Sequence, residues 1–423
     1  MAAAGTFAVC LPGSRIGSDL GKWAAVLGVL VVLAASSPAP RVAAAGTGKS
    51  FNQWVSEFRI EALAAGISAA VFDRAFRKVR PDPAIARSDV SQPEFARTIW
   101  DYLDKAVSAR RVSVGRRKLR QTAATLNKLE KRFGVSRYAL AAIWGVESAY
   151  GRIIGRKYVI RSLATAAYRG RRQAFGRREL LAALAMLERG DVTPGKFVGS
   201  WAGAVGQTQM LPSAYNKFAV DFDGDKRRDV WTTPGDALAS AANLLRSFNW
   251  RAGEPVLHEI VLPKDFNYRL SGIDKFRPVS QWAAMGVVRA RRIAFGATTR
   301  PGAVILPAGA KGPAFMIYRN FHVVRLYNKS TAYALAVGHL ANRLRGDRPL
   351  VTAWPRRQKR LSIMQLRELQ QRLIRRGADT GGADGRVGPK TRRAVSVFQQ
   401  QADMVADGHP SPAVLERLRR DDL

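Results

Sequence analysis

The chain has 423 residues, with 69 lysine and arginine residues against 32 aspartate and glutamate residues and a formal charge of +37. Its length predicts two or three domains, and its 47% hydrophobic content excludes a generally disordered chain. The excess of positive charge indicates attraction to a polyanion such as nucleic acid, anionic lipid or an acidic cell-wall polymer, although an arginine-rich coding bias explains part of it.

The N-terminus has the pattern of a secretory signal peptide. Basic residues precede an apolar run over 23–35, and small residues and prolines follow it. This run is shorter than the roughly 20 residues that span a bilayer, and an uncleaved anchor is the alternative. We therefore predict a signal peptide over 1–45 and a periplasmic protein without a stable membrane span, which makes nucleic acid an unsuitable partner. Cys10 precedes the apolar run and is not placed for lipid attachment after it.

The chain as far as residue 250 is predicted to be all-helical. Apolar residues recur at three- and four-residue steps over 50–77, 94–107, 119–133, 138–149, 180–187 and 237–248. We interpret these leucine and aromatic stripes as packing surfaces rather than binding surfaces.

The pattern changes after residue 250. Strands are predicted over 255–263, 304–307, 314–318 and 321–326, and helices over 279–285 and 331–344. We interpret this region as a small β-containing lobe inserted before a last helix. Two lobes with a groove between them would suit a polymer substrate. Residues 346–361, rich in proline and arginine, predict a basic linker.

The stretch 141–151 reads Ala-Ala-Ile-Trp-Gly-Val-Glu-Ser-Ala-Tyr-Gly and is predicted to form the last turns of a helix. Glu147 falls on the same face as Ile143 and Trp144. An apolar face and the negative end of a helix both raise the pKa of a carboxyl group, which can then protonate a leaving group. The alternative is a glutamate paired with an arginine such as Arg152.

A second dense stretch begins Gly-Ser-Trp-Ala-Gly-Ala-Val-Gly at residue 199. Its glycine and serine residues allow a ligand or another backbone to approach closely. Ser200, Gln207 and Gln209 offer uncharged hydrogen-bonding groups, which suit sugar hydroxyl and acetamido groups. A close helix crossing with satisfied polar groups is the alternative. The basic segment 168–172 is either a contact for stem-peptide carboxylates or a solvated loop.

Together, these two stretches resemble the lytic murein transglycosylase B family. The similarity extends to Tyr327-Asn328 and covers roughly residues 50–345. It implies a mainly α fold with a lysozyme-like α lobe, and Glu147 as the sole acid/base. The substrate-binding residues that we expect on this basis are Ser200, Gln207, Gln209, Met210, Tyr327 and Asn328. Gln207 and Met210 stand where the family often has Tyr and Phe.

The resemblance implies chemistry with one carboxyl group, whereas ordinary glycosidases use two. Glu147 would protonate the bond oxygen between N-acetylmuramic acid and N-acetylglucosamine while the acetamido oxygen stabilises the anomeric carbon. The C6 hydroxyl would then close on C1, giving a 1,6-anhydromuramoyl end without water. No cofactor is expected for this chemistry, and peptidoglycan glycan strands are the expected partner of a monomer. A hydrolysing muramidase and a non-catalytic wall-binding or scaffold protein remain as alternatives.

Residues 221–232 imitate an EF-hand loop, with carboxylates at alternate positions. The loop departs from the rule because Lys226 stands where glycine is expected and Thr232 where a glutamate should close the site. The ligands that we expect for a structural Ca²⁺ are Asp221, Asp223, Asp225, the carbonyl of Arg227, and Asp236. The alternative is an acidic turn neutralised by neighbouring basic residues.

Residues 362–423 resemble the three-helix peptidoglycan-binding module of cell-wall enzymes. Asp384-Gly385 predicts a turn, Pro389 opens a helix, and Val395 and Phe398 bury one face of that helix. Such a module would keep an enzyme on an insoluble polymer through avidity.

Overall fold

The computed structural model describes residues 49–85, 98–170, 172–296 and 298–421. The signal peptide predicted over 1–45 lies outside these described residues. From Lys49 onward the chain forms one compact unit. Within the described ranges, no helix is both long and apolar enough to cross a membrane.

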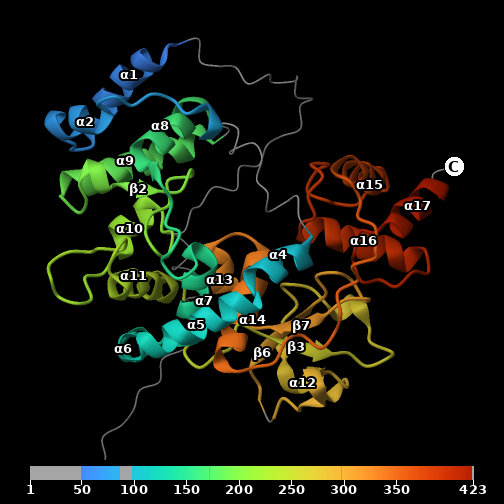
Figure 1. The fold of residues 1–423 in the computed structure, drawn as a ribbon. Helices are drawn as coiled ribbons and strands as arrows, with labels where there is room; N and C mark the ends of the chain where they lie inside the picture. Colours follow the sequence, from blue (N-terminus) through green and yellow to red (C-terminus); the bar gives the residue numbers. More distant parts are fainter. Residues whose placement is uncertain (1–48, 86–97, 171, 297, 422–423) are drawn as a thin grey trace, which may run out of the picture. The chain divides into compact units, whose positions relative to one another are not determined.

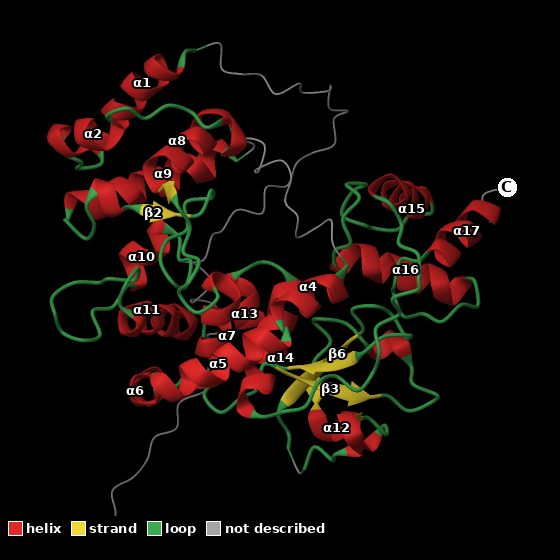
Figure 2. Ribbon diagram, in the orientation of Figure 1, coloured by secondary structure: helices red, strands yellow, loops and turns green. Residues whose placement is uncertain are grey.

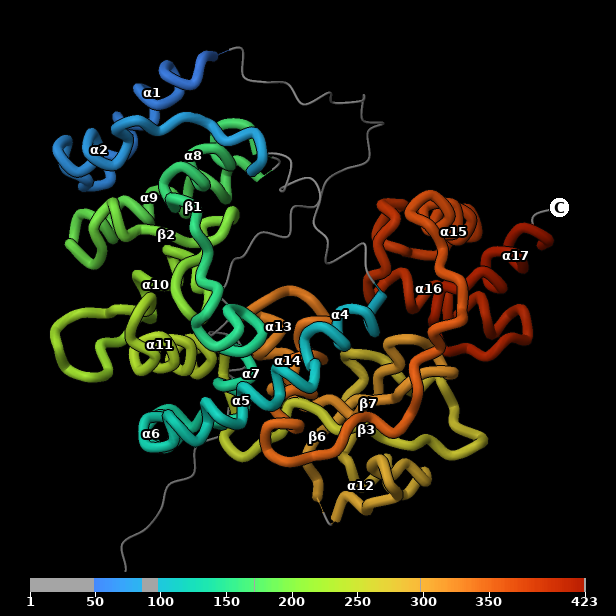
Figure 3. The backbone as a smooth tube through the Cα atoms, in the orientation of Figure 1, coloured from blue at the N-terminus to red at the C-terminus, as the bar shows by residue number. Residues whose placement is uncertain are grey.

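The described chain up to residue 247 is mainly helical, but the prediction of an all-helical region is wrong at the two short paired strands β1 and β2. Its elements are α1 (Phe51–Ala64), α2 (Ala69–Phe76), α4 (Ile99–Ala106), α5 (Ala109–Gln121), α6 (Ala123–Phe133), α7 (Arg137–Ser148), β1 (Lys157–Tyr158), α8 (Val159–Arg169), α9 (Gln173–Glu188), β2 (Val198–Gly199), α10 (Pro212–Phe218) and α11 (Pro234–Ser247) (Figure 1). The chain runs from α7 through β1 into α8, and β1 pairs antiparallel with β2 (Figure 3).

The largest differences from the predicted helix boundaries lie at two places. The single helix predicted over 50–77 is two helices, because Gly66 takes a φ of 85° and turns the chain out of α1. The helix predicted over 119–133 is also divided, because residues 119–121 end α5 and α6 begins at Ala123. The prediction missed the rest of α5, and it missed α8 and α10. The α5 sequence is strongly basic and contains few large apolar residues, so it shows no apolar stripe of the kind used to predict the other helices.

Two helical clusters hold this region together. In the first, α1 and α2 pack with α8 and α9 around buried aromatic residues such as Phe58 and Phe72. In the second, α7 packs against α5, α6, α11 and α14 (Thr331–Arg345). Every residue of α7 from Ala139 to Gly145 is buried. The helix that carries Glu147 is therefore the centre of the second cluster, which gives its last turn a rigid support.

A five-stranded antiparallel sheet follows in the order β4-β6-β7-β3-β5. Figure 2 shows its strands β3 and β6 in yellow. The elements of this region are β3 (Leu257–Val261), β4 (Arg277–Pro278), α12 (Val279–Ala284), β5 (Val288–Arg289), β6 (Pro301–Ile305) and β7 (Ala314–Ile317). Alternate residues face opposite ways: Phe315 joins the core around α7, whereas Met316 packs with Trp282 of α12. Both faces are covered, which explains why every residue of β7 is buried.

The strand predicted over 321–326 is wrong, because this segment belongs to the helix α13 (Arg319–Tyr327). Its β-branched residues Val323 and Val324 are buried together with Phe321. Helical backbone places these side chains on the second core cluster, and this tertiary packing outweighs their preference for strands.

Residues 346–361 are packed against β3, β7 and α4 along part of their length. The Glu259 carboxylate accepts hydrogen bonds from the backbone N–H groups of Val351 and Thr352 at 2.9 and 2.8 Å. The ring of Trp354 lies 6.2 Å from Trp100 and 6.3 Å from Phe315, measured between ring centroids. The segment predicted as a linker is therefore held by hydrogen bonds and ring contacts, and we call residues 346–361 the strap.

The C-terminal module consists of α15 (Ile363–Arg375), α16 (Pro389–Gln401) and α17 (Pro412–Arg420) around a small apolar core. Ser362 and Gln365 form a capping box that starts α15, and Pro389 occupies the first position of α16, as predicted. The Asp407 carboxylate accepts a hydrogen bond from the backbone N–H of Ala310 at 2.8 Å. This contact ties the module to the loop after β6.

Candidate active site

Glu147 lies in the last turn of α7 and is half-buried, whereas Trp144, one turn earlier, is only 1% exposed. The helix ends at Ser148, three residues before the glycine expected to stop it. Ala149 and Tyr150 take positive φ values of 51° and 63°. A non-glycine residue in this conformation costs roughly 1–3 kcal/mol and persists where the surroundings enforce it, as at active sites.

Two tyrosines have Glu147 as an electrostatic neighbour. Burial raises the pKa of Tyr333 on α14 well above its ordinary value, and the charge of Glu147 raises it further. Burial and then the charge of Glu147 also raise the pKa of Tyr327 at the end of α13. The Tyr327 hydroxyl donates to the carbonyl oxygen of Thr208 at 2.6 Å. Both phenols therefore stay neutral. Their positions show that α13, α14 and the stretch after residue 199 meet at the end of α7.

Gln207 connects the stretch 141–151 to the stretch after residue 199 through hydrogen bonds. Its Oε1 accepts a hydrogen bond from Trp144 Nε1 at 2.9 Å, and its Nε2 donates to the carbonyl oxygen of Trp231 at 3.2 Å. The Ser148 hydroxyl donates to the backbone oxygen of Gln207 at 2.5 Å. Gln207 is 4% exposed, so both polar atoms of its amide are used inside the protein.

Gly151 is required by this arrangement. It has a φ of 83°, and a Cβ at this position would collide with Oε1 of Gln207. Any side chain here would push against the group that orients Trp144. The need for glycine at this position is thus explained by its contact with the second dense stretch rather than by the helix end alone.

The other expected substrate-binding residues fall into two classes of exposure. Met210 is 2% exposed and belongs to the protein interior. Ser200, Gln209 and Asn328 are half-buried, as is Tyr327. Gln209 takes a positive φ of 51° and donates through Nε2 to the carbonyl oxygens of Ile154 and Gly206.

Ser200 stabilises the turn that follows it. Its hydroxyl oxygen accepts a hydrogen bond from the backbone N–H of Ala204 at 3.0 Å, and its own N–H donates to the carbonyl oxygen of the same residue at 2.8 Å. The backbone of Gly155 lies against that of Gly199, so close that a Cβ at Gly155 would overlap it. The segment after α7 and the stretch after residue 199 therefore run in direct contact.

The carboxylates of the predicted metal loop do converge. Asp221, Asp223, Asp225 and Asp236 each offer an oxygen, and these oxygens lie within 4.8 Å of one another. Lys226, at the position where an EF-hand loop has glycine, takes a φ of 67° and so adopts the left-handed conformation that this position demands. Four carboxylate oxygens at this spacing fit a hard divalent cation such as Ca²⁺.

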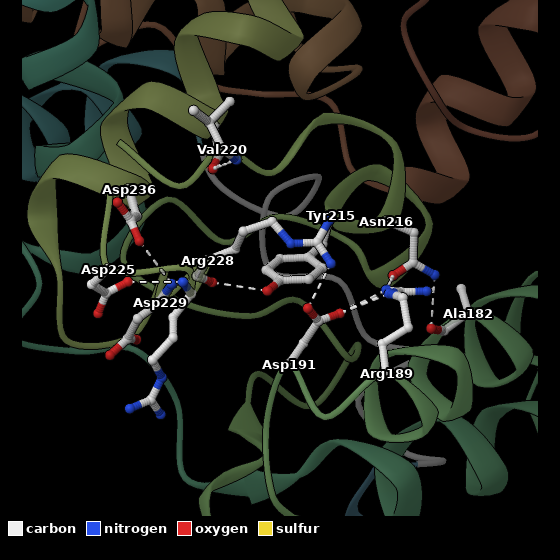
Figure 4. Close-up of polar contacts among 12 residues, drawn as sticks. Ala182, Arg189, Asp191, Tyr215, Asn216, Val220, Asp225, Arg228, Asp229 and Asp236 are labelled. Atoms are coloured by element: carbon white, nitrogen blue, oxygen red, sulfur yellow. Dashed lines mark hydrogen bonds and ion pairs between the residues drawn. The ribbon is translucent and has the colours of Figure 1, made fainter. Parts of the chain in front are cut away.

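The basic residues of this loop do not neutralise the cluster. Arg228 forms an ion pair with Asp191 at 2.5 Å, and Asp191 is also paired with Arg189 at 2.7 Å (Figure 4). Among the described residues, no ion pair joins the cluster to Lys226 or Arg227. Burial raises the pKa of Asp236 to about 6, and the charges of Asp223 and Asp221 contribute to this rise. The geometry therefore leaves the cluster with uncompensated negative charge.

Asp229 is turned away from the cluster, although it occupies the ninth position of the loop. Its carboxylate accepts hydrogen bonds from the backbone N–H groups of Trp231 and Thr232 at 2.9 Å. The Asp229 backbone N–H donates to Asp236 at 2.9 Å (Figure 4). Asp236 thus receives its orientation from the loop that it closes.

The sequence analysis missed Tyr333 as a neighbour of Glu147. Tyr333 stands two residues into α14 within an apolar helical pattern, where it is indistinguishable from a packing residue. Its position beside Glu147 results from the packing of α14 on α7, for which the local sequence carries no signal.

A model of the family described as "Transglycosylase SLT domain" matches residues 50–342, and one described as "Putative peptidoglycan binding domain" matches residues 365–418. The chain is 32% identical over 223 residues to the membrane-bound lytic murein transglycosylase B of Escherichia coli K12. This similarity covers 51% of the chain and 58% of the relative, so the chain spans less than two thirds of that protein's length.

Two solved structures are also similar. SltB3 from Pseudomonas aeruginosa, in complex with NAG-anhNAM-pentapeptide, shares 48% identity and a TM-score of 0.84, covering 88% of this chain and 100% of that chain. The Escherichia coli lytic transglycosylase Slt35, in complex with calcium, shares 26% identity and a TM-score of 0.59, covering 69% of this chain and 92% of that chain. The chain therefore belongs to the transglycosylase SLT domain family, and it carries a C-terminal domain of the peptidoglycan-binding type.

Proposed function

We propose that the chain is a lytic transglycosylase that cleaves the β-1,4 bond between N-acetylmuramic acid and N-acetylglucosamine, with Glu147 as its single acid/base. The observation that carries this proposal is the position of Glu147: a half-buried carboxyl group at the end of a buried helix, beside the neutral phenols of Tyr327 and Tyr333. Family membership and the complex of the similar SltB3 with NAG-anhNAM-pentapeptide support the same reaction.

In the proposed mechanism, the proton of Glu147 moves to the glycosidic oxygen as the bond from C1 to that oxygen breaks. The acetamido oxygen of the muramoyl unit stabilises the positive charge at C1. The Glu147 anion then takes the proton of the C6 hydroxyl while this oxygen bonds to C1, which restores the acid without consuming water. Neither phenol can supply charge. The Tyr333 hydroxyl can donate a hydrogen bond to the Glu147 carboxylate between the two steps, whereas the Tyr327 hydroxyl is already donated to the carbonyl oxygen of Thr208.

The proposed substrate contacts are Ser200, Gln209, Tyr327 and Asn328, because these expected residues retain exposed surface. Gln207 and Met210 are instead proposed to support the site from behind. Gln207 holds the Trp144 ring, and Met210 fills the interior under the stretch that carries Gln209.

Analysis of the products tests this function. Purified sacculi incubated with the protein should release fragments with 1,6-anhydromuramoyl ends, identified by mass spectrometry. Reducing muramic acid ends would instead establish a hydrolysing muramidase. Binding to sacculi without release of fragments would establish a non-catalytic wall-binding protein.

We also propose that the carboxylate cluster, with the carbonyl of Arg227, holds a structural Ca²⁺. The convergence of four carboxylates without ion-pair partners among the described residues supports this proposal. The ion would stabilise the loop between α10 and α11 and would take no part in the chemistry. Isothermal titration calorimetry should detect calcium binding by wild-type protein and its loss in Asp223→Asn, and the absence of heat at millimolar calcium would refute the site.

For the domain organisation, we propose a catalytic domain over 50–345, a strap over 346–361 and a wall-binding domain over 362–423. The wall-binding domain would act through peptidoglycan, which places the working enzyme outside the cytoplasm. A chain ending at residue 361 should sediment with sacculi less than the full chain does. Equal sedimentation would remove the binding role.

A further inference from the structure

A basic cavity of about 480 Å³ lies beside the end of the catalytic helix. One wall is formed by α5 and the other by the turn after Glu147, which spans residues 149–152. We call this cavity the basic pocket, defined by its five cationic residues Arg110, Arg111, Arg117, Lys118 and Arg152. Val114 and Tyr150 add an apolar strip to the same wall.

The charge of the basic pocket is not compensated within the described part of the protein. No described aspartate or glutamate lines it, and α5 contains no acidic residue. Among the described residues, none of its five cations forms an ion pair, whereas Arg137 pairs with Glu130 and Arg419 with Glu368 elsewhere in the molecule. Arg111 donates to the backbone oxygen of Lys105, at 2.8 Å. Several like charges around one concavity produce a strong positive potential, which attracts anions.

The basic pocket is built on the same support as Glu147. The Tyr150 hydroxyl donates to the backbone oxygen of Arg111 at 3.0 Å, and its ring meets Trp144 edge-on with centroids 5.7 Å apart. The ammonium group of Lys118 lies 5.7 Å from the centroid of the Trp144 ring. An anion in the pocket would therefore bind next to the helix turn that carries Glu147.

We propose that the basic pocket binds the carboxylate groups of a stem peptide on the glycan strand that occupies the active site. This inference rests on the proposed function. A pentapeptide with a free C-terminus carries at least one carboxylate and reaches roughly 17 Å when extended, so one attached near the cleaved bond can span several turns of helix. Arginine side chains recognise carboxylates through paired, charge-assisted hydrogen bonds. A concave wall with an apolar strip suits a short peptide better than a flat lipid surface.

A binding experiment tests the pocket independently of catalysis. The ligand is N-acetylmuramoyl-pentapeptide, and the protein carries Glu147→Gln so that no turnover occurs. The test variant adds Arg110→Gln, Arg117→Gln and Arg152→Gln, three exposed positions. The control adds Arg74→Gln, Arg251→Gln and Lys264→Gln, which are also exposed and remove the same charge. We expect about tenfold weaker binding in the test variant only, a loss that amidation of the ligand carboxylates should reproduce.

Equal affinity of the test and control variants, or no effect of amidation, would overturn the proposal. A rate measurement with active protein distinguishes it from the proposed function: the three pocket substitutions should lower the preference for peptide-bearing over peptide-free glycan strands. If wild-type protein makes no anhydro ends on either substrate, the proposed function fails while the binding result still stands. Binding to phosphatidylglycerol vesicles that the test variant alone loses, with peptide affinity unchanged, would assign the pocket to lipid and refute the peptide.

Discussion

The end of α7 and the loop between α10 and α11 both hold carboxyl groups, but in opposite settings. Glu147 has neutral phenols beside it and a buried apolar helix behind it. Asp221, Asp223 and Asp225 gather with Asp236 at one point, without ion-pair partners among the described residues. A carboxyl group among neutral groups can gain and lose one proton, whereas four clustered carboxylates repel one another and are stabilised by a cation or by protonation. On the functions proposed above, the same functional group would serve chemistry in one region and structure in the other.

The largest expected effect is the loss of activity on substitution of Glu147, which the same kind of substitution in the aspartate cluster should not cause. Glu147→Gln should lower the rate of anhydro-end formation by about 10²–10⁴-fold, because the proton donor is lost while the shape of the side chain is kept. Asp236→Asn should leave this rate within a few-fold in the presence of calcium. Both rates are measured on sacculi by mass spectrometry. A Glu147→Gln protein that keeps full activity would remove the catalytic assignment.

Gly151→Ala should damage the support of Glu147. The alanine needs a strained positive φ and collides with Gln207, so we expect a loss of about 2–4 kcal/mol in the free energy of unfolding. Gly190→Ala is the matched control, because Gly190 has a φ of 73° and open space around it. It should cost about 1 kcal/mol. Denaturant titration of both variants measures the difference, and equal losses would refute the role of the Gln207 contact.

Calcium should stabilise the protein more at pH 7.5 than at pH 5. The pKa of Asp236 is raised to about 6 from an ordinary 3.8, so between these values the folded protein holds a proton that the unfolded chain lacks. Without calcium, the stability contributed by this group therefore falls as pH rises through that window. Calcium needs the ionised form and offsets the loss above pH 6.

A calcium concentration 100-fold above Kd should add about 2.7 kcal/mol at pH 7.5. Scanning calorimetry with calcium and with a chelator at both pH values measures this gain. Asp236→Asn should reduce it at pH 7.5 and remove most of its pH dependence. A calcium-induced rise in Tm that is equal at both pH values would contradict the part assigned to Asp236.

Tyr333→Phe should give the smallest effect. Loss of one hydroxyl group beside Glu147 should lower kcat by roughly 2- to 12-fold, the range expected for one hydrogen bond to a reacting group. Tyr138→Phe serves as the control on the same helix as Glu147, because the Tyr138 hydroxyl forms no hydrogen bond within the described part of the chain. If the Tyr333→Phe enzyme has the wild-type kcat, the Tyr333 hydroxyl does not contribute to the reaction and the residue serves only to pack the core.

The sequence predicted features that depend on neighbouring residues along the chain. The face shared by Ile143, Trp144 and Glu147 follows from helical periodicity. The alternating aspartates from Asp221 form a local pattern, which folds into the expected cluster. The capping residue Ser362 and the Pro389 start of α16 are local signals of the same kind.

Other predictions failed or stayed open because contacts between distant segments decide them. Residues 321–326 have strand-like composition but are helical, since a helix buries Val323 and Val324 in the core around α7. Gln207 was expected to contact sugar, yet its amide is bonded to Trp144 and Trp231 inside the protein. Periodicity cannot tell which partner a buried amide will have.

By itself, the sequence determined the candidate residues, namely one glutamate at a helix end and a set of spaced aspartates, and it indicated a separate C-terminal module. Only the tertiary structure decided their surroundings, by packing α14 against α7 and α13 against α14, and so placing two phenols beside Glu147. It also brought α5 against the turn after Glu147 and thereby formed the basic pocket. Local backbone preferences act over a few residues, whereas pKa values and electrostatic potential depend on all groups nearby in space, whatever their distance along the chain.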